Sequence, residues 1–201
     1  MEDQLSLSNI RLTVSPQALP LFTTVLQSGI EVMVRQGETL GKFLSDFPGF
    51  TADYLANTVQ TIFLNGTAVD DLTLPLTGSN PVLALSAAMP GLAGAIFRKN
   101  SFHSALRTET NAVRSASMQQ HCCTVILKLF NSIARDRGQE LLRAGVCIQS
   151  DSLGTFFIKR PHLREYLNNI RLGDRDLEYT EFLAVLSELA QVKLHIDAIN
   201  G

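Results

Sequence analysis

Short strand-type segments alternate with short helix-type segments through the first half of the chain, and turn-forming residues separate them. Residues 9–14 and 30–34 alternate apolar with polar side chains, which predicts two half-buried strands. Between residues 40 and 47 the apolar side chains recur at helical spacing, directly after the helix-capping residue Thr39. Residues 81–86 form a further apolar run of strand length. The pattern predicts an α+β fold.

The second half of the chain carries more helical spacing. Ile126, Leu129 and Ile133 favour a helix over residues 122–134, although residues 124–130 also fit a strand. Further helices are expected at residues 151–159, 162–170 and 176–189, and short strands at residues 146–148 and 192–196. This half is therefore predicted to be mainly helical.

The change of character near residue 100 predicts two domains, residues 1–98 with most of the sheet and residues 99–201 with most of the helices. The whole chain has 201 residues, of which 45% are hydrophobic and 18% are charged. That composition is typical of a globular protein and excludes a disordered chain.

Six elements follow one another in residues 9–94: a strand, a helical piece, a second strand with a turn, a longer helix, the strand and turn of residues 61–66, and the strand of residues 82–85. This order resembles the β-grasp, ubiquitin-like sulfur-carrier family that includes the small subunit of molybdopterin synthase. The resemblance implies a β-grasp-like mixed sheet with a helix packed on it in residues 1–98.

The resemblance also directs attention to Met89, Pro90, Gly91 and Gly94, which stand where the family has a proline-containing tail that ends in Gly-Gly. In the family the final glycine ends the chain, and its carboxylate is converted to a thiocarboxylate. Here Ala93 precedes Gly94 and the chain continues beyond it, so the same chemistry requires cleavage after Gly94. The segment is the first candidate interaction surface.

The charge of the chain is close to balanced, with a formal net charge of −2. That value predicts neither a nucleic-acid-binding protein nor an acidic tail. Residues 98–143 nevertheless hold eight basic and three acidic residues. Arg135 and Arg137 lie in this stretch and form the second candidate surface, which is suited to an acidic partner.

Three cysteines, of which Cys122 and Cys123 are adjacent, do not make a disulfide framework. No secretory signal pattern follows Met1, so we expect reduced thiols and a cytoplasmic location. Residues 72–97 carry no charge, but Pro90 and two glycines interrupt the apolar part, which is also short for a membrane span. We expect no membrane association.

Motifs that would indicate a specific chemistry are incomplete. His121 and the two cysteines after it lack metal-ligand spacing. Residues 174–182 resemble the end of a calcium loop, but Ile170 and Leu172 occupy positions where carboxylates are required. No phosphate-binding loop or nucleophile motif is present. We expect no cofactor and no metal, and the chain is more typical of a non-enzyme than of an enzyme.

The preferred interpretation is a non-enzymatic protein-interaction or adaptor protein. Its partner is expected to be a protein rather than a nucleic acid, and a homodimer is left open. Two alternatives remain: a sulfur-carrier-like protein that is cleaved after Gly94, and a small enzyme with a site between the two halves.

Overall fold

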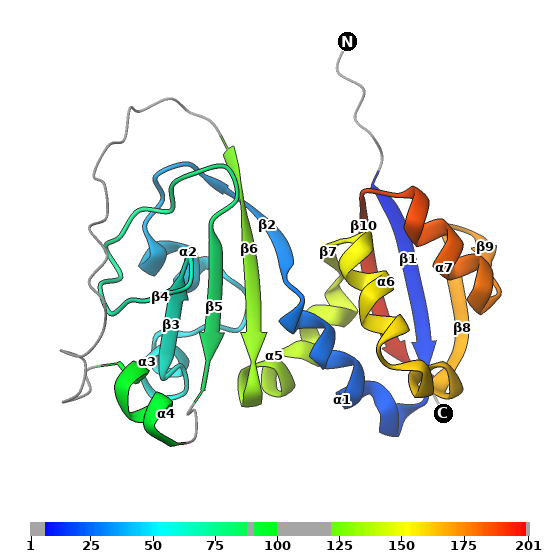
Figure 1. Ribbon diagram of the computed structural model, residues 1–201, viewed down its shortest axis with the longest axis horizontal. Coiled ribbons are helices and arrows are strands. Elements are labelled where there is room, and N and C mark those ends of the chain that lie inside the picture. The colour runs from blue at the N-terminus through cyan, green and yellow to red at the C-terminus, as the bar shows by residue number, and fades with distance from the viewer. Residues whose placement is uncertain (1–6, 88–90, 100–121, 200–201) are drawn as a thin grey trace, which may run out of the picture. The chain divides into compact units, whose positions relative to one another are not determined.

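The computed structural model describes residues 7–87, 91–99 and 122–199 (Figure 1). It is a mixed α+β structure. The strands are β1 Ser8–Val14, β2 Ile30–Arg35, β3 Thr61–Leu64, β4 Thr67–Ala68, β5 Val82–Ser86, β6 Cys122–Phe130, β7 Val146–Gln149, β8 Leu167–Leu172, β9 Arg175–Asp176 and β10 Gln191–Ala198. The α-helices are α1 Leu19–Phe22, α2 Leu40–Asp46, α3 Ala52–Asn57, α4 Gly91–Phe97, α5 Asn131–Ala144, α6 Ser150–Ile158 and α7 Tyr179–Glu188. The 3-10 helices are η1 Pro16–Ala18, η2 Thr23–Gln27 and η4 Pro161–Tyr166.

The chain divides into two compact units. The first unit joins residues 1–30 to residues 137–201, and the second unit consists of residues 31–136. The division differs from the expected boundary between residues 98 and 99, because β1 pairs with β10 and β8 rather than with strands of the first half.

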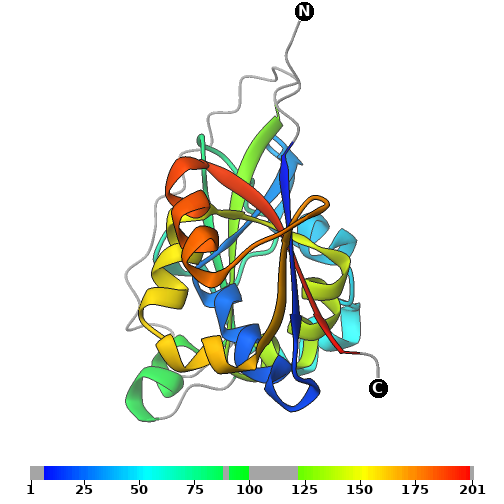
Figure 2. The same cartoon turned by 90° about the vertical axis from the view of Figure 1, so that its right-hand side faces the viewer.

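The strands of the first unit lie in the order β7-β10-β1-β8-β9. β1 is parallel to β10 and antiparallel to β8. Helices α6 and α7 lie on one side of these strands (Figure 2). Their Phe157 and Phe182 rings have centroids 5.2 Å apart, and both side chains are fully buried together with Ile10, Leu12 and Val14 of β1. This cluster forms the core of the unit.

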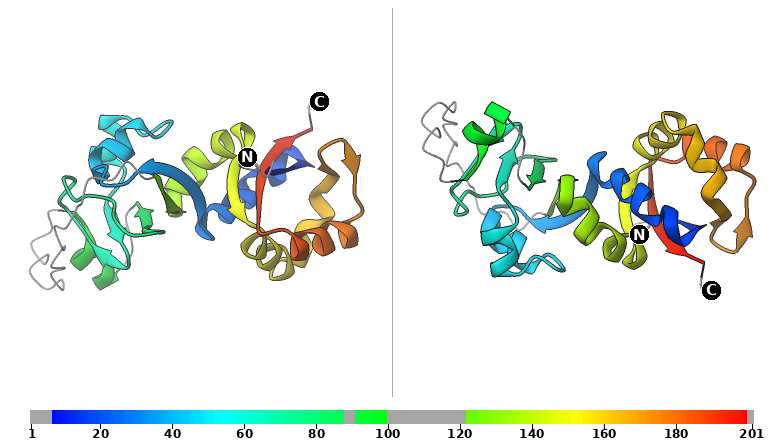
Figure 3. Two further views of the ribbon diagram at one scale, coloured as in Figure 1. Left: turned by 90° about the horizontal axis from the view of Figure 1, so that it is seen from above. Right: turned by 90° about the horizontal axis from the view of Figure 1, so that it is seen from below.

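The strands of the second unit lie in the order β4-β3-β5-β6-β2. β5 and β6 are parallel, whereas β3 is antiparallel to β5. Helices α2 and α3 lie on one side of these strands and α4 lies on the other (Figure 3). The core holds alternate residues of β5 and β6 and the apolar side of α2: Leu83, Leu85, Val125, Leu127, Leu129, Leu40, Phe43 and Leu44.

The expected helix over residues 122–134 begins only at Asn131, because residues 122–130 form β6. Buried side chains at every second position, from Cys123 to Leu129, and parallel pairing with β5 stabilise the strand. The strand interpretation of residues 124–130, which the sequence also allowed, is the one that the structure bears out.

The expected helix over residues 162–170 is also absent. A 3-10 helix ends at Tyr166, and β8 follows and pairs with β1, where Ile170 lies opposite Leu12. With strands β6 to β10 all following residue 121, the expectation of a mainly helical second half is not confirmed for the residues that the structure describes.

The uncharged stretch of residues 72–97 contains β5 and the seven-residue helix α4. None of the helices in the described parts of the chain has the length and apolar character needed to cross a membrane.

Candidate functional site

The first candidate segment lies partly outside the described residues, which exclude Met89 and Pro90. Gly91 is exposed and begins α4 with a φ of +70°, and Gly94 is buried within the same helix. From Gly91 onward, the described part of this segment is therefore helical rather than an extended tail.

Contacts of Phe97, in the last turn of α4, and of Lys99, just after it, hold this helix to the rest of the second unit. The Phe97 and Phe63 ring centroids are 5.3 Å apart. The backbone N–H of Lys99 donates to the Gln60 carbonyl at 2.7 Å, and its Nζ donates to the Leu55 carbonyl at 2.6 Å. Burial lowers the pKa of Lys99, and Asp70 partly offsets this effect.

The second candidate pair lies on α5, where Arg135 is exposed and Arg137 is half-buried. Residues two positions apart on an α-helix point in different directions, so the two guanidinium groups do not share one face. Between them, Asp136 accepts a hydrogen bond from the Tyr54 hydroxyl at 3.4 Å. The helix therefore does not assemble the pair into one basic surface.

A groove of about 400 Å³ in the second unit is the site that the structure adds to these candidates. We call it the β2–α2 groove. It is lined by Val32, Met33, Val34, Arg35, Glu38, Phe43, Asp46, Phe47, Pro48 and Cys122. Most of these side chains are apolar, and they come from β2, from α2 with its flanking residues, and from the first residue of β6.

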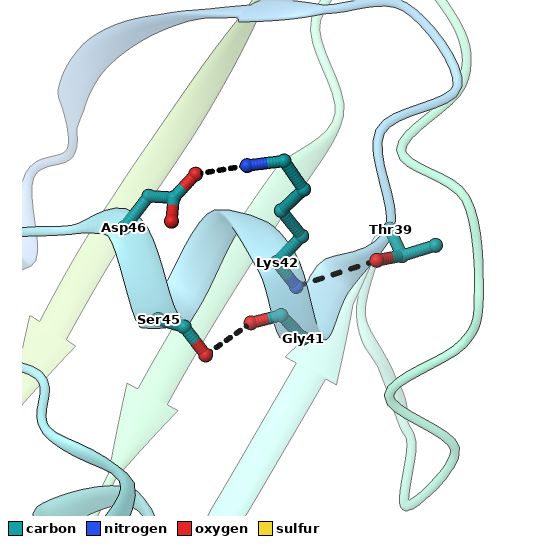
Figure 4. Close-up of polar contacts among 5 residues, drawn as sticks. All are labelled: Thr39, Gly41, Lys42, Ser45 and Asp46. Atoms are coloured by element: carbon teal, nitrogen blue, oxygen red, sulfur yellow. Dashed lines mark hydrogen bonds and ion pairs between the residues drawn. The ribbon is translucent and has the colours of Figure 1, made fainter.

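Local hydrogen bonds fix the helix that forms one wall of the groove (Figure 4). Thr39 caps α2, because its hydroxyl oxygen accepts from the Lys42 backbone N–H at 3.3 Å. The Ser45 hydroxyl donates to the Gly41 carbonyl at 2.8 Å, and Lys42 forms an ion pair with Asp46 one turn further along. The hydrogen bond and charge of Asp46 raise the pKa of Lys42.

A close backbone approach also positions α2. The Gly41 N–H donates to the Leu72 carbonyl at 2.8 Å, and a Cβ at Gly41 would lie 3.2 Å from the Leu72 Cβ. On the groove side of the helix, the Phe43 and Phe47 ring centroids are 5.9 Å apart. The polar side chains in and before α2 thus bond within this segment, and Phe43, Asp46 and Phe47 line the groove.

Met33 is the most exposed large apolar side chain among the described residues, with 75% of its surface accessible. Cys122, on the same groove, is also exposed. A methionine side chain is flexible and polarisable, so it adapts to differently shaped apolar partners. Neither residue stood out as a binding residue in the sequence, because an alternating strand does not reveal which of its positions the fold leaves uncovered.

A second cavity, of about 380 Å³, lies in the first unit beside β8 and the start of α7. Its Arg164 guanidinium stacks 5.2 Å from the centroid of the Tyr179 ring. Burial raises the pKa of the Tyr179 hydroxyl, and the charge of Arg164 partly offsets that rise. This cavity is polar.

The carboxylates of the polar cavity already have partners. Glu178 and Glu181 form a reciprocal capping box at the start of α7, and Glu181 also accepts from Arg175 at 2.9 Å. Asp176 lies 3.2 Å from the Arg171 guanidinium. The acidic residues of the calcium-like stretch thus stabilise the pairing of β8 with β9 and the N-terminus of α7.

In the described part of the chain, no three His, Cys, Asp or Glu side chains come together in a way that could hold a metal ion. Comparison of the chain with protein-family models, with curated proteins and with solved structures finds no match. The functional proposal therefore rests on the geometry of this chain alone.

Proposed function

We propose that the chain is a non-enzymatic protein-binding module whose β2–α2 groove receives an apolar segment of a partner protein. The observation that carries the proposal is the exposure of Met33 on a groove whose other apolar walls are Val32, Phe43, Phe47 and Pro48. Removing apolar surface from water is favourable, by roughly 25 cal/mol for each Å² that is buried. An exposed apolar side chain beside a groove with further apolar lining is typical of protein-binding sites.

We also infer that the second unit has a β-grasp-like arrangement. Two observations support this inference: its strands form a mixed order with the parallel pair β5 and β6 in the middle, and α2 packs on one side of them. In this interpretation β6 takes the place that the sequence suggested for residues 9–14, which lie in the other unit.

The sulfur-carrier alternative stays a prediction. It requires cleavage of the chain after Gly94, in the middle of α4. The end of α4 would also have to separate from the strands, because the Phe97 ring packs against the Phe63 ring. The intact mass of the protein from native cells distinguishes a cleaved chain from an uncleaved one. The alternative of a small enzyme likewise stays a prediction.

Cys122 provides a direct test of the groove, because its exposed thiol accepts a maleimide photo-crosslinker. In a Cys147→Ala background, we expect the labelled protein to form a covalent adduct with one partner protein after illumination in native extract. Met33→Asp should abolish the adduct, because a carboxylate on the groove opposes entry of an apolar side chain.

Leu21→Asp is the matched control, since Leu21 is also an exposed apolar residue, at 45%, but belongs to the first unit. It should leave the adduct unchanged. Equal adduct from the Met33→Asp protein, or an equal loss in both variants, would show that the groove is not the binding site.

A further inference from the structure

The strands of the first unit have one polar face. In β1 the buried residues Ile10, Leu12 and Val14 alternate with exposed Arg11 and half-buried Thr13. Because successive side chains of a strand point to opposite faces, Arg11 and Thr13 point away from the core that α6 and α7 cover.

Three strands bring basic side chains together on this face. Arg11 lies opposite His195 of parallel β10 and opposite Arg171 of antiparallel β8. Lys193 precedes His195 by two positions and therefore points to the same face. These four residues define what we call the basic face.

Acidic side chains neutralise the basic face only in part. Arg171 pairs with two carboxylates: its Nε lies 3.2 Å from Oδ1 of Asp176 in β9, and its Nη2 lies 3.9 Å from Oδ1 of Asp174 in the turn before β9. The side chains of Arg11 and Lys193 form no hydrogen bond or ion pair with the residues that the structure describes. Asp197 also belongs to this face, but it lies opposite Thr13 rather than opposite a basic residue.

One pair of like charges on this face has carboxylate partners only on the Arg171 side. Arg11 and Arg171 lie directly opposite each other, and like charges in that position destabilise a sheet. The charge of the basic face is also opposite in sign to the net charge of −2 of the whole chain. An anionic binding partner would supply a counter-charge to Arg11.

We propose that the basic face binds an acidic segment of a partner protein. An arginine such as Arg11 pairs with a carboxylate through two parallel hydrogen bonds, and Lys193 adds a second charge beside it. The strands of this unit carry no Phe, Tyr or Trp on which nucleic-acid bases would stack, so the surface favours acidic side chains over a nucleic acid. The proposal is independent of the β2–α2 groove, which belongs to the other unit.

A fluorescein-labelled peptide of eight glutamates is the probe, and its polarisation is measured against the full-length protein at low salt. We expect binding that weakens with added salt, and a loss of affinity of about tenfold or more in Arg11→Glu and in Lys193→Glu. Lys159→Glu is the matched control: it makes the same charge change at an exposed lysine just after α6, outside the basic face, and should have little effect.

Three results would overturn the proposal. The first is no binding of the peptide by the wild-type protein at low salt. The second is an equal loss of affinity in the Lys159→Glu control, which would indicate a response to net charge alone. The third is tighter binding of a labelled eight-nucleotide thymidine strand than of the peptide, which would assign the face to nucleic acid. Thermal melting of each variant confirms that it is folded.

Discussion

Two glycines of the first unit stand where no side chain fits. A Cβ at Gly138 would lie 2.7 Å from the Cβ of Thr23. A Cβ at Gly145 would lie 2.2 Å from Cε1 of His195, whose Nδ1 is 3.3 Å from the Arg143 carbonyl oxygen. Gly145 also has a φ of +93°, which other residues adopt only with strain. Glycine is therefore required at this junction between α5 and β7.

We expect Gly145→Ala to lower the free energy of unfolding by about 2–4 kcal/mol, from backbone strain together with displacement of the His195 ring. Gly37→Ala separates the two effects, because Gly37 has a φ of +81° and a Cβ added there would meet nothing within 4 Å. It should cost about 1 kcal/mol. Chemical denaturation measures both, and equal losses would show that the contact with His195 is unimportant.

At the scale of elements, α2 depends on the residue that precedes it. Thr39 supplies the side-chain cap of this seven-residue helix, and a helix this short is not stable by itself. Because α2 and the residue after it carry Phe43 and Phe47 on the groove side, the position of the helix also determines the shape of the β2–α2 groove.

Thr39→Ala should lower the free energy of unfolding by about 1 kcal/mol, because the Lys42 N–H loses its acceptor. Thr39→Ser keeps a hydroxyl at the same place and should recover most of that loss. Urea denaturation compares the two variants. If serine and alanine are equally destabilising, the hydroxyl does not cap the helix.

Local patterns were sufficient to predict several elements. The alternation of residues 30–34, the capped helix after Thr39 and the final alternating run of residues 192–196 correspond to β2, α2 and β10. The patterns failed for β6 and β8. In residues 122–134, Ile126, Leu129 and Ile133 fit helical spacing, whereas Val125, Leu127 and Leu129 fit the alternation of a strand. Pairing with distant strands decides between the two, and a single segment does not contain that information.

The candidate site was harder to predict for the same reason. The β2–α2 groove exists because Met33, Phe47 and Cys122, which are distant in sequence, line one cavity. In the sequence, Cys122 was considered only for a disulfide and for a weak metal-ligand pattern, not as a groove residue. Likewise, the basic face combines Arg11 with Arg171 and Lys193, whereas charge counting along the sequence pointed to residues 98–143.

At the scale of the whole molecule, the two units differ in how the chain builds them. Residues 31–136 form the second unit as one continuous segment, whereas the first unit needs both the beginning and the end of the chain. β1 lies between β10 and β8 and pairs with both. A fragment of residues 137–201 therefore lacks the strand that joins β10 to β8.

We therefore expect residues 31–136 to fold when expressed alone, and residues 137–201 to remain unfolded. Adding a peptide of residues 1–30 to the second fragment should restore β structure, because β1 then fills the gap. Circular dichroism and amide NMR dispersion report both outcomes. A folded fragment of residues 137–201 without the peptide would contradict this assembly.

The parallel pairing of β1 with β10 has a consequence for synthesis. On a ribosome, β1 emerges early, but β10 becomes available only after all of residues 31–136 have been translated. During that interval Ile10, Leu12 and Val14 have no neighbouring strand, and uncovered apolar strands are prone to aggregate. The first segment therefore stays without its partner strand until the last residues of the chain have been synthesised.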